Sequence, residues 1–251
     1  MDQDSEMFRF LMKFYRNGEY EDKRFFQRLN NPDISGLKVL EVGCGTGSLA
    51  IHMASKMSPA KVVAFDLDEQ NIDFANSNLE YNHADFKNTI HYCVSTCSEL
   101  LNKNERFDCI VSKDSFEHII AFEDTFDEMW NLLKPGGRLM AGFGPLYYSP
   151  RGGHSLTVLP FDHILLPEKT ILRRYNRRKN RDIKSVWEYG LNKFSLDDYL
   201  NVFKKYAIKP EFIRFNQSDK FFGKVASQVL RFPILRKLTF NVYLILKKAN
   251  S

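Results

Sequence analysis

Apolar residues recur along the chain at two different spacings, and the change falls near residue 37. Between residues 6 and 30 they recur every three or four positions, which is typical of an amphipathic helix. Gly18 interrupts this stretch, so we expect two N-terminal helices. After residue 37, short apolar runs alternate with helical patterns. The expected strands are residues 37–42, 61–65, 90–94, 107–112 and 138–143, and the expected helices between them are residues 48–57, 69–79 and 124–133.

This alternation predicts an α/β protein with a doubly wound, Rossmann-like parallel sheet. Residues 145–194 interrupt the alternation, and a loop this long in a compact domain usually serves function. After a capping-box pattern at Ser195, we expect a helix to Tyr206, strands at 208–215 and 239–246, and a helix at 219–231. The predicted domains are an N-terminal helical cap (1–36) and a larger domain (37–251), with 145–194 as a substrate-side insertion after the fifth strand.

The composition excludes several classes of protein. With 43% hydrophobic residues and four cysteines in 251 residues, the chain is neither disordered, collagenous nor a disulfide scaffold. It contains no apolar run long enough for a transmembrane helix. The acidic N-terminus does not resemble a secretory signal, so we expect reduced thiols and a cytoplasmic location.

The net charge of +5 is concentrated in one segment, residues 169–184, which has eight basic residues against Asp182. The segment is either a solvated helix face or a contact for an anionic acceptor, an anionic membrane surface or RNA. The arginines of this segment are not interleaved with several aromatic residues that could stack on bases. RNA is therefore the weaker option.

A glycine-rich loop follows the first expected strand and precedes a helix. Glycines let the backbone turn tightly and approach a ligand, and the helix N-terminus offers free N–H groups. A turn that only needs positive φ angles is the alternative. Ser48 and Leu49 after the last glycine exclude the phosphate-binding loop, and Ser48 stands where the dinucleotide fingerprint needs glycine. The loop contains Glu41, Gly43, Cys44, Gly45 and Gly47.

The pattern Glu-x-Gly-x-Gly-x-Gly resembles the first motif of class I S-adenosylmethionine (AdoMet)-dependent methyltransferases, and the chain resembles the type 11 methyltransferases over residues 37–143. The resemblance implies a seven-stranded sheet with its last strand antiparallel, AdoMet as cofactor, and Asp66 as acceptor of the two ribose hydroxyl protons. Thr96 stands where the family usually has an acid. The implied cofactor-binding residues are Glu41, Gly43, Cys44, Gly45, Gly47, Asp66, Leu67, Thr96, Cys97, Ser112 and Lys113.

Missing motifs narrow the methyl acceptor. The Asn/Asp-Pro-Pro-Tyr motif of amide and adenine methylation is absent. No cysteine follows a proline, as cytosine C5 methylation would need. Methylation of protein arginine uses a pair of glutamates after the fourth strand, and only Glu117 is present there. We therefore expect a small-molecule acceptor, or one linked to a lipid or glycan, methylated at oxygen rather than carbon. Two alternatives stay open: a non-catalytic cofactor-binding subunit, and an RNA methyltransferase. The oligomeric state is also left open.

The insertion carries the candidate bases. Histidines titrate near neutral pH, so His154 is the first candidate and His163 the second. His118 is the third candidate, and Asp114 could replace a histidine as the base. Each has a structural alternative: His154 as a turn residue, Asp114 as a helix cap. Cys93 and Cys97 lack a second ligand pair, so no metal site is expected.

Overall fold

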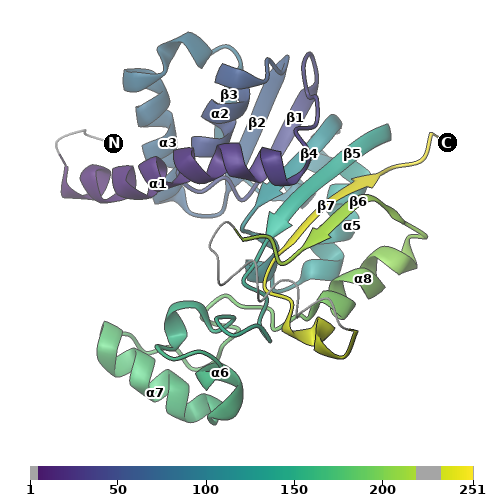
Figure 1. Cartoon of the computed structure of the whole chain (residues 1–251). Coiled ribbons are helices and arrows are strands. Elements are labelled where there is room, and N and C mark those ends of the chain that lie inside the picture. Colours follow the sequence, from purple (N-terminus) through teal and green to yellow (C-terminus); the bar gives the residue numbers. More distant parts are fainter. Residues whose placement is uncertain (1–4, 219–232, 251) are drawn as a thin grey trace. The chain divides into compact units, whose positions relative to one another are not determined.

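Seven strands form one sheet in the order β3-β2-β1-β4-β5-β7-β6 in the computed structural model, which describes residues 5–218 and 233–250. The arrow of β7 runs opposite to that of β5 in Figure 1, so the last strand is antiparallel. The expected α/β, doubly wound, Rossmann-like class is confirmed. The strands are β1 (Lys38–Val42), β2 (Lys61–Asp66), β3 (Ile90–Val94), β4 (Phe107–Lys113), β5 (Leu133–Phe143), β6 (Pro210–Phe215) and β7 (Val242–Lys247).

The parallel register of the first strands brings their carboxyl ends to one edge. Val42 at the end of β1 pairs with Phe65 of β2, and Asp66 at the end of β2 pairs with Val94 of β3. Glu41 pairs with Val111 near the end of β4. Loops that follow these four strands therefore start at the same edge, where ligands bind in open α/β sheets.

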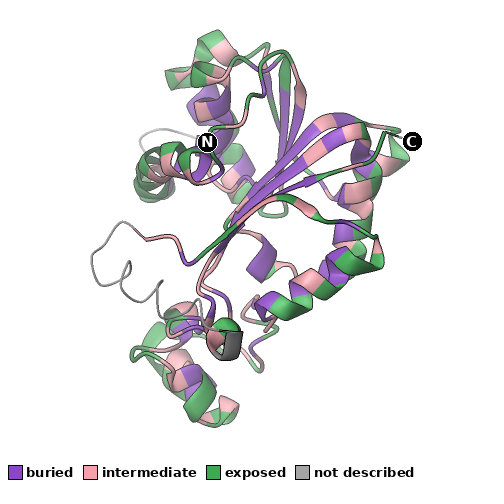
Figure 2. Cartoon of the chain, turned by 45° about the vertical axis from the view of Figure 1, so that its right-hand side comes forward, coloured by how far each residue is buried: buried purple, intermediate pink, exposed green. Residues whose placement is uncertain are grey.

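The chain divides into two compact units. The first contains Met1–Lys113, Thr125–Ala141 and Ile245–Ser251, and the second contains Asp114–Asp124 and Gly142–Leu244. The core of the first unit lies along its strands, where apolar side chains are almost fully buried (Figure 2). Its helices are α1 (Glu6–Arg28), α2 (Ser48–Lys56), α3 (Glu69–Asn82), η1 (Ala84–Phe86) and α4 (Cys97–Asn102), and α5 (Phe122–Leu132) begins in the second unit.

The expected break at Gly18 is wrong, because α1 is one continuous helix. A Cβ atom at Gly18 would collide with the side chain of Ser48 at the start of α2. Gly18 therefore permits close packing of two helices and does not end one. Phe8 and Tyr15 of α1 pack on Phe74 of α3, which fixes the apolar stripe of α1 against the first unit.

The second unit confirms some boundaries and shifts others. Ser195 and Asp198 form the expected capping box at the start of α8, but the last strand begins at Val242 instead of residue 239. In the first unit, β5 begins at Leu133, earlier than expected. The helix expected at 219–231 lies outside the described residues. The helices of this unit are η2 (Phe116–His118), η3 (His154–Leu156), α6 (Asp162–Leu165), α7 (Glu168–Lys179), α8 (Leu196–Lys205) and η4 (Pro233–Leu238).

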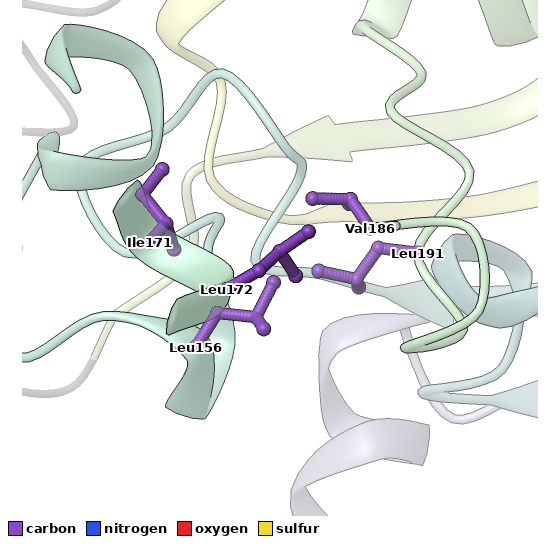
Figure 3. Close-up of a cluster of buried hydrophobic side chains, with 5 residues drawn as sticks. All are labelled: Leu156, Ile171, Leu172, Val186 and Leu191. Carbon is purple, nitrogen blue, oxygen red and sulfur yellow. The ribbon is translucent and has the colours of Figure 1, made fainter. Parts of the chain in front are cut away.

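The segment expected as an insertion has an apolar core of its own (Figure 3). Two adjacent residues of α7, Ile171 and Leu172, pack there against Leu156 and Leu191. Val186 completes this cluster and is fully buried. The segment is therefore a folded element with its own packing, which fits the expected insertion, whose place on the substrate side stays a prediction.

Among the helices within residues 5–218 and 233–250, none combines the length and hydropathy of a membrane span.

The first prediction concerns Gly47, where the glycine loop meets α2. Gly47 has φ +80°, and a Cβ atom there would lie 2.7 Å from the ring of buried Tyr92. Overpacking costs about 1–3 kcal/mol, so Gly47→Ala should lower the free energy of unfolding by that amount beyond the backbone penalty. Gly36→Ala is the matched control, because Gly36 has φ +70° and no described atom within 4 Å of such a Cβ. Urea unfolding measures both, and equal losses would contradict the packing argument.

Candidate functional site

The loop between β1 and α2 is held by a carboxylate from the next strand. Oδ2 of Asp66 accepts the N–H of Gly45 at 2.8 Å, and Oδ1 accepts the N–H of Asp68 at 3.0 Å. The N–H groups of Gly43 and Cys44 donate to the carbonyl oxygen of Phe65. The glycine loop and the loop after β2 are therefore fixed to each other, and each Asp66 oxygen keeps a second acceptor position.

The far end of the glycine loop is fixed by Tyr92 of β3. Its hydroxyl group donates to the carbonyl oxygen of Gly47 at 2.6 Å, and Gly47 adopts the left-handed conformation just before α2. No side chain caps the first turn of α2. The N–H groups in the first turn of α2 therefore have no side-chain cap. Such N–H groups at a helix N-terminus are the ones that bind polar ligand groups.

Two buried carboxyl groups and one partly buried lysine lie close together in the first unit. Asp22 of α1 is fully buried and forms an ion pair with Lys113 at the end of β4. Glu41 of β1 is 3% exposed, and its pKa is raised well above the usual range by burial and then by the charge of Asp22. No described residue donates a hydrogen bond to Oδ2 of Asp22 or Oε2 of Glu41. Two carboxyl groups thus have one lysine between them. A cationic ligand group could donate hydrogen bonds to the two oxygens that no described residue reaches.

The other residues expected at the cofactor lie at the same strand ends of the first unit. Ser112 donates its hydroxyl to the carbonyl oxygen of Val42 at 3.1 Å. Leu67 is 73% exposed and follows Asp66 directly. Thr96 caps α4 by accepting the N–H of Glu99. Cys97 is almost fully buried, and burial raises its pKa to about 12, so its side chain is a packing element. The cofactor roles of these residues stay predictions.

All four candidate bases, His118 included, belong to the second unit. Nε2 of His154 lies 3.1 Å from the carbonyl oxygen of Pro145, and Nε2 of His163 lies 2.6 Å from that of Tyr147. Burial lowers the pKa of both, that of His154 to about 4. Both imidazoles are therefore neutral near pH 7. Asp114 is exposed and has φ +53°. Their role as bases stays a prediction.

Sequence reasoning assigned no role in the site to two buried acids, Asp22 and Glu117. Asp22 interrupts the apolar stripe of α1 at a position where helical spacing expects an apolar residue, and this signal was available. Glu117 is 3% exposed, and burial together with the charge of Asp114 raises its pKa to about 8. It lies next to His118, whose ring centroid is 5.2 Å from that of His154. Only the folded chain shows this neighbourhood.

The sheet order and the acid–glycine loop at the carboxyl ends of β1 and β2 define a Rossmann-like fold. Residues 39–137 match the profile of a family described as "Methyltransferase domain". This segment is a class I AdoMet-dependent methyltransferase domain, and S-adenosyl-L-methionine is its cofactor. The resemblance inferred from the loop is thereby confirmed.

Two curated relatives and one solved structure illustrate the similarity. A ubiquinone biosynthesis O-methyltransferase of Roseobacter denitrificans is 31% identical over 149 residues, 58% of this chain and 56% of that protein. A phosphoethanolamine N-methyltransferase of Zea mays is 34% identical over 123 residues, 49% of this chain and 23% of that protein. An S-adenosylmethionine-dependent methyltransferase of Mesorhizobium loti has the same fold, with a TM-score of 0.58 and 17% identity. The match covers 92% of this chain and 99% of that protein. The chain spans about half the length of these curated relatives or less.

The second prediction tests the ion pair between α1 and β4. Removing one partner of a buried pair costs roughly 3–5 kcal/mol, so Asp22→Ala should lower the free energy of unfolding by about that much. Glu21→Ala is the control on the same helix, because the Glu21–Arg24 pair is partly exposed and such pairs contribute at most about 1 kcal/mol. Chemical denaturation measures both variants. Equal losses would show that the Asp22–Lys113 contact does not stabilise the first unit.

Proposed function

We propose that the protein transfers the methyl group of AdoMet to an oxygen atom of a small-molecule acceptor, one that is anionic or linked to a lipid or glycan. The observation that carries this proposal is the glycine loop clamped by Asp66, together with the buried carboxylates Asp22 and Glu41. Each of the latter has one oxygen that no described donor reaches.

The residues present fit AdoMet. Its methionine carries an ammonium group, whose N–H donors match the oxygens of Asp22 and Glu41 that no described donor reaches. Its ribose offers two hydroxyl donors, which match the remaining acceptor positions of Asp66. Glycines with positive φ at positions 43, 45 and 47 let the backbone approach the cofactor closely.

The chemistry is a displacement at carbon. When bound, AdoMet supplies a methyl group that its sulfonium charge already activates. The acceptor oxygen would form a bond to that methyl carbon while the carbon–sulfur bond breaks with its electron pair going to sulfur, and the hydroxyl proton of the acceptor would pass to a base or to water. The side chains of this protein hold the acceptor in line and exclude water, which supplies much of the rate. His154, His163 and Asp114 are the sequence-predicted groups for taking the proton.

Two observations support an oxygen acceptor. The alignment with the ubiquinone O-methyltransferase of Roseobacter denitrificans covers a larger share of this chain than that with the phosphoethanolamine N-methyltransferase of Zea mays. The sequence between residues 112 and 116 also lacks the proline-containing motif of amide nitrogen methylation. Nitrogen methylation is the second candidate, which the Zea mays relative favours.

Methyl-labelled AdoMet and a panel of acceptors test the acceptor atom. Phenols with a polyprenyl tail and hydroxylated glycolipids should be methylated, with release of S-adenosylhomocysteine, and mass spectrometry of the products locates the methyl group on oxygen. Methylation of phosphoethanolamine with no turnover of any hydroxyl acceptor would overturn the oxygen assignment and favour nitrogen.

The third prediction tests the cofactor site. Asp66→Ala removes the acceptor of two ribose hydroxyl groups, and each hydrogen bond to a charged group contributes roughly 1.5–3 kcal/mol. Affinity for AdoMet should fall by at least tenfold, since about 1.4 kcal/mol is tenfold. Asp73→Ala, an exposed acid on α3, is the control and should bind normally. Calorimetry measures both, with thermal unfolding as a check on folding. Unchanged binding by a folded Asp66→Ala variant would rule the site out.

A further inference from the structure

Three side chains that can bind metal ions meet in the second unit. One ligand atom each from Glu117, His118 and His154 lies within 4.8 Å of the other two. The first two residues belong to η2, and His154 begins η3, so separate segments of the chain bring them together. Two imidazoles and one carboxylate are a ligand set that binds divalent transition metals in proteins.

Glu117 is the strongest single indication of a ligand. Its side chain is 3% exposed, and its Oε1 accepts the N–H of Gly144 at 2.8 Å. Within the part of the chain that the structure describes, Oε2 has no hydrogen-bond donor. Leaving a buried carboxylate oxygen without a donor or cation is costly. A cation bound at Oε2 would remove that cost.

In each of the two histidines, one ring nitrogen is hydrogen-bonded to a backbone carbonyl oxygen. Nδ1 of His118 lies 2.7 Å from the carbonyl oxygen of Gly190, and Nε2 of His154 lies 3.1 Å from that of Pro145. A carbonyl oxygen only accepts, so these two nitrogens carry the protons, and the other nitrogen of each ring has a free lone pair. Histidines that bind metals almost always donate their second N–H to a carbonyl or carboxylate in this way.

We propose that Glu117, His118 and His154 form a site for one divalent cation of the first transition row. Bonds of about 2.1 Å to such an ion place the ligand atoms of a four-coordinate site about 3.4 Å apart, so the cluster closes by roughly 1 Å on binding. His118 is exposed and has room for that movement. Imidazole favours zinc, cobalt or iron over magnesium and calcium, which prefer oxygen ligands.

Three protein ligands leave coordination positions for water or for an oxygen of a bound molecule. On the assumption of the proposed function, that molecule is the methyl acceptor. A metal held by these residues would lower the pKa of a bound hydroxyl group, so that the hydroxyl proton would pass to solvent water and the acceptor oxygen would be reactive without a protein base. His154 then acts as a ligand and not as the proton acceptor that the sequence predicts.

Titration of the chelator-treated full chain with cobalt(II) tests the site, followed by calorimetry and by visible absorption. We expect one ion per chain, and magnesium should not displace it at equal concentration. Glu117→Gln and His118→Ala should each weaken binding at least tenfold. His118 is exposed, so its replacement leaves the fold intact even if the buried Glu117→Gln variant does not fold. His91→Ala, which removes an exposed histidine of β3, is the control for adventitious binding.

The outcomes separate the two proposals. Cobalt binding that is unchanged in His118→Ala, or that falls equally in His91→Ala, overturns the metal site. The proposed role of the metal in activating the acceptor is overturned if the protein binds the metal but transfers methyl groups at the same rate with and without it. AdoMet binding is measured in the same preparations, because the residues proposed for it lie in the other unit. If the unsubstituted protein does not bind AdoMet, the proposed function is contradicted, but the result on metal binding still holds.

Discussion

The carboxylate of Asp66 is the constraint on which the candidate cofactor site depends. Its two oxygens accept N–H groups from Gly45 and Asp68, so one side chain fixes the loops after β1 and β2. The parallel register places Asp66 where this is possible, because Val42 and Phe65 pair at the strand ends. The same carboxylate is also the acceptor proposed for the ribose. Organising the loop and binding the ligand are therefore one function of one side chain, and the loop is held in shape before the cofactor arrives.

Buried acids mark the candidate sites in both units. In the first unit Asp22 and Glu41 each have an oxygen that no described residue satisfies, and in the second unit Glu117 has another. Such atoms are rare in folded proteins, because each costs free energy that packing elsewhere must offset. The three acids differ in how far the protein compensates them. Asp22 has Lys113 as an ion-pair partner, whereas Glu117 accepts the N–H of Gly144 and feels the unfavourable charge of Asp114. Glu117 is also the acid that lies beside two histidines.

The sequence predicted the features that depend on local pattern. Strand positions, the glycine loop and the capping box at Ser195 follow from spacing and from residue type within a few positions. Features that depend on distant contacts were missed. Gly18 looked like a helix break, but its role is set by Ser48, and the partner of Asp22 is Lys113, 91 residues further along the chain. The ligand cluster needed the fold as well, since no spacing rule connects Glu117 with His154.

The basic segment follows partly from packing. Ile171 and Leu172 turn inward on α7, and helical geometry then directs Arg173, Arg174 and Arg177 outward, where all three are exposed. That accounts for their position but not for their number, because lysine, glutamate or serine would be equally soluble there. Arg178 alone of this group is shown binding backbone carbonyls, those of Ser155 and Leu156 at the start of the insertion's core. The excess of positive charge on an otherwise slightly acidic chain thus lies on the same folded segment that carries His154. An anionic acceptor would be attracted to that segment before any specific contact forms, which is how a surface potential raises the local concentration of a charged ligand.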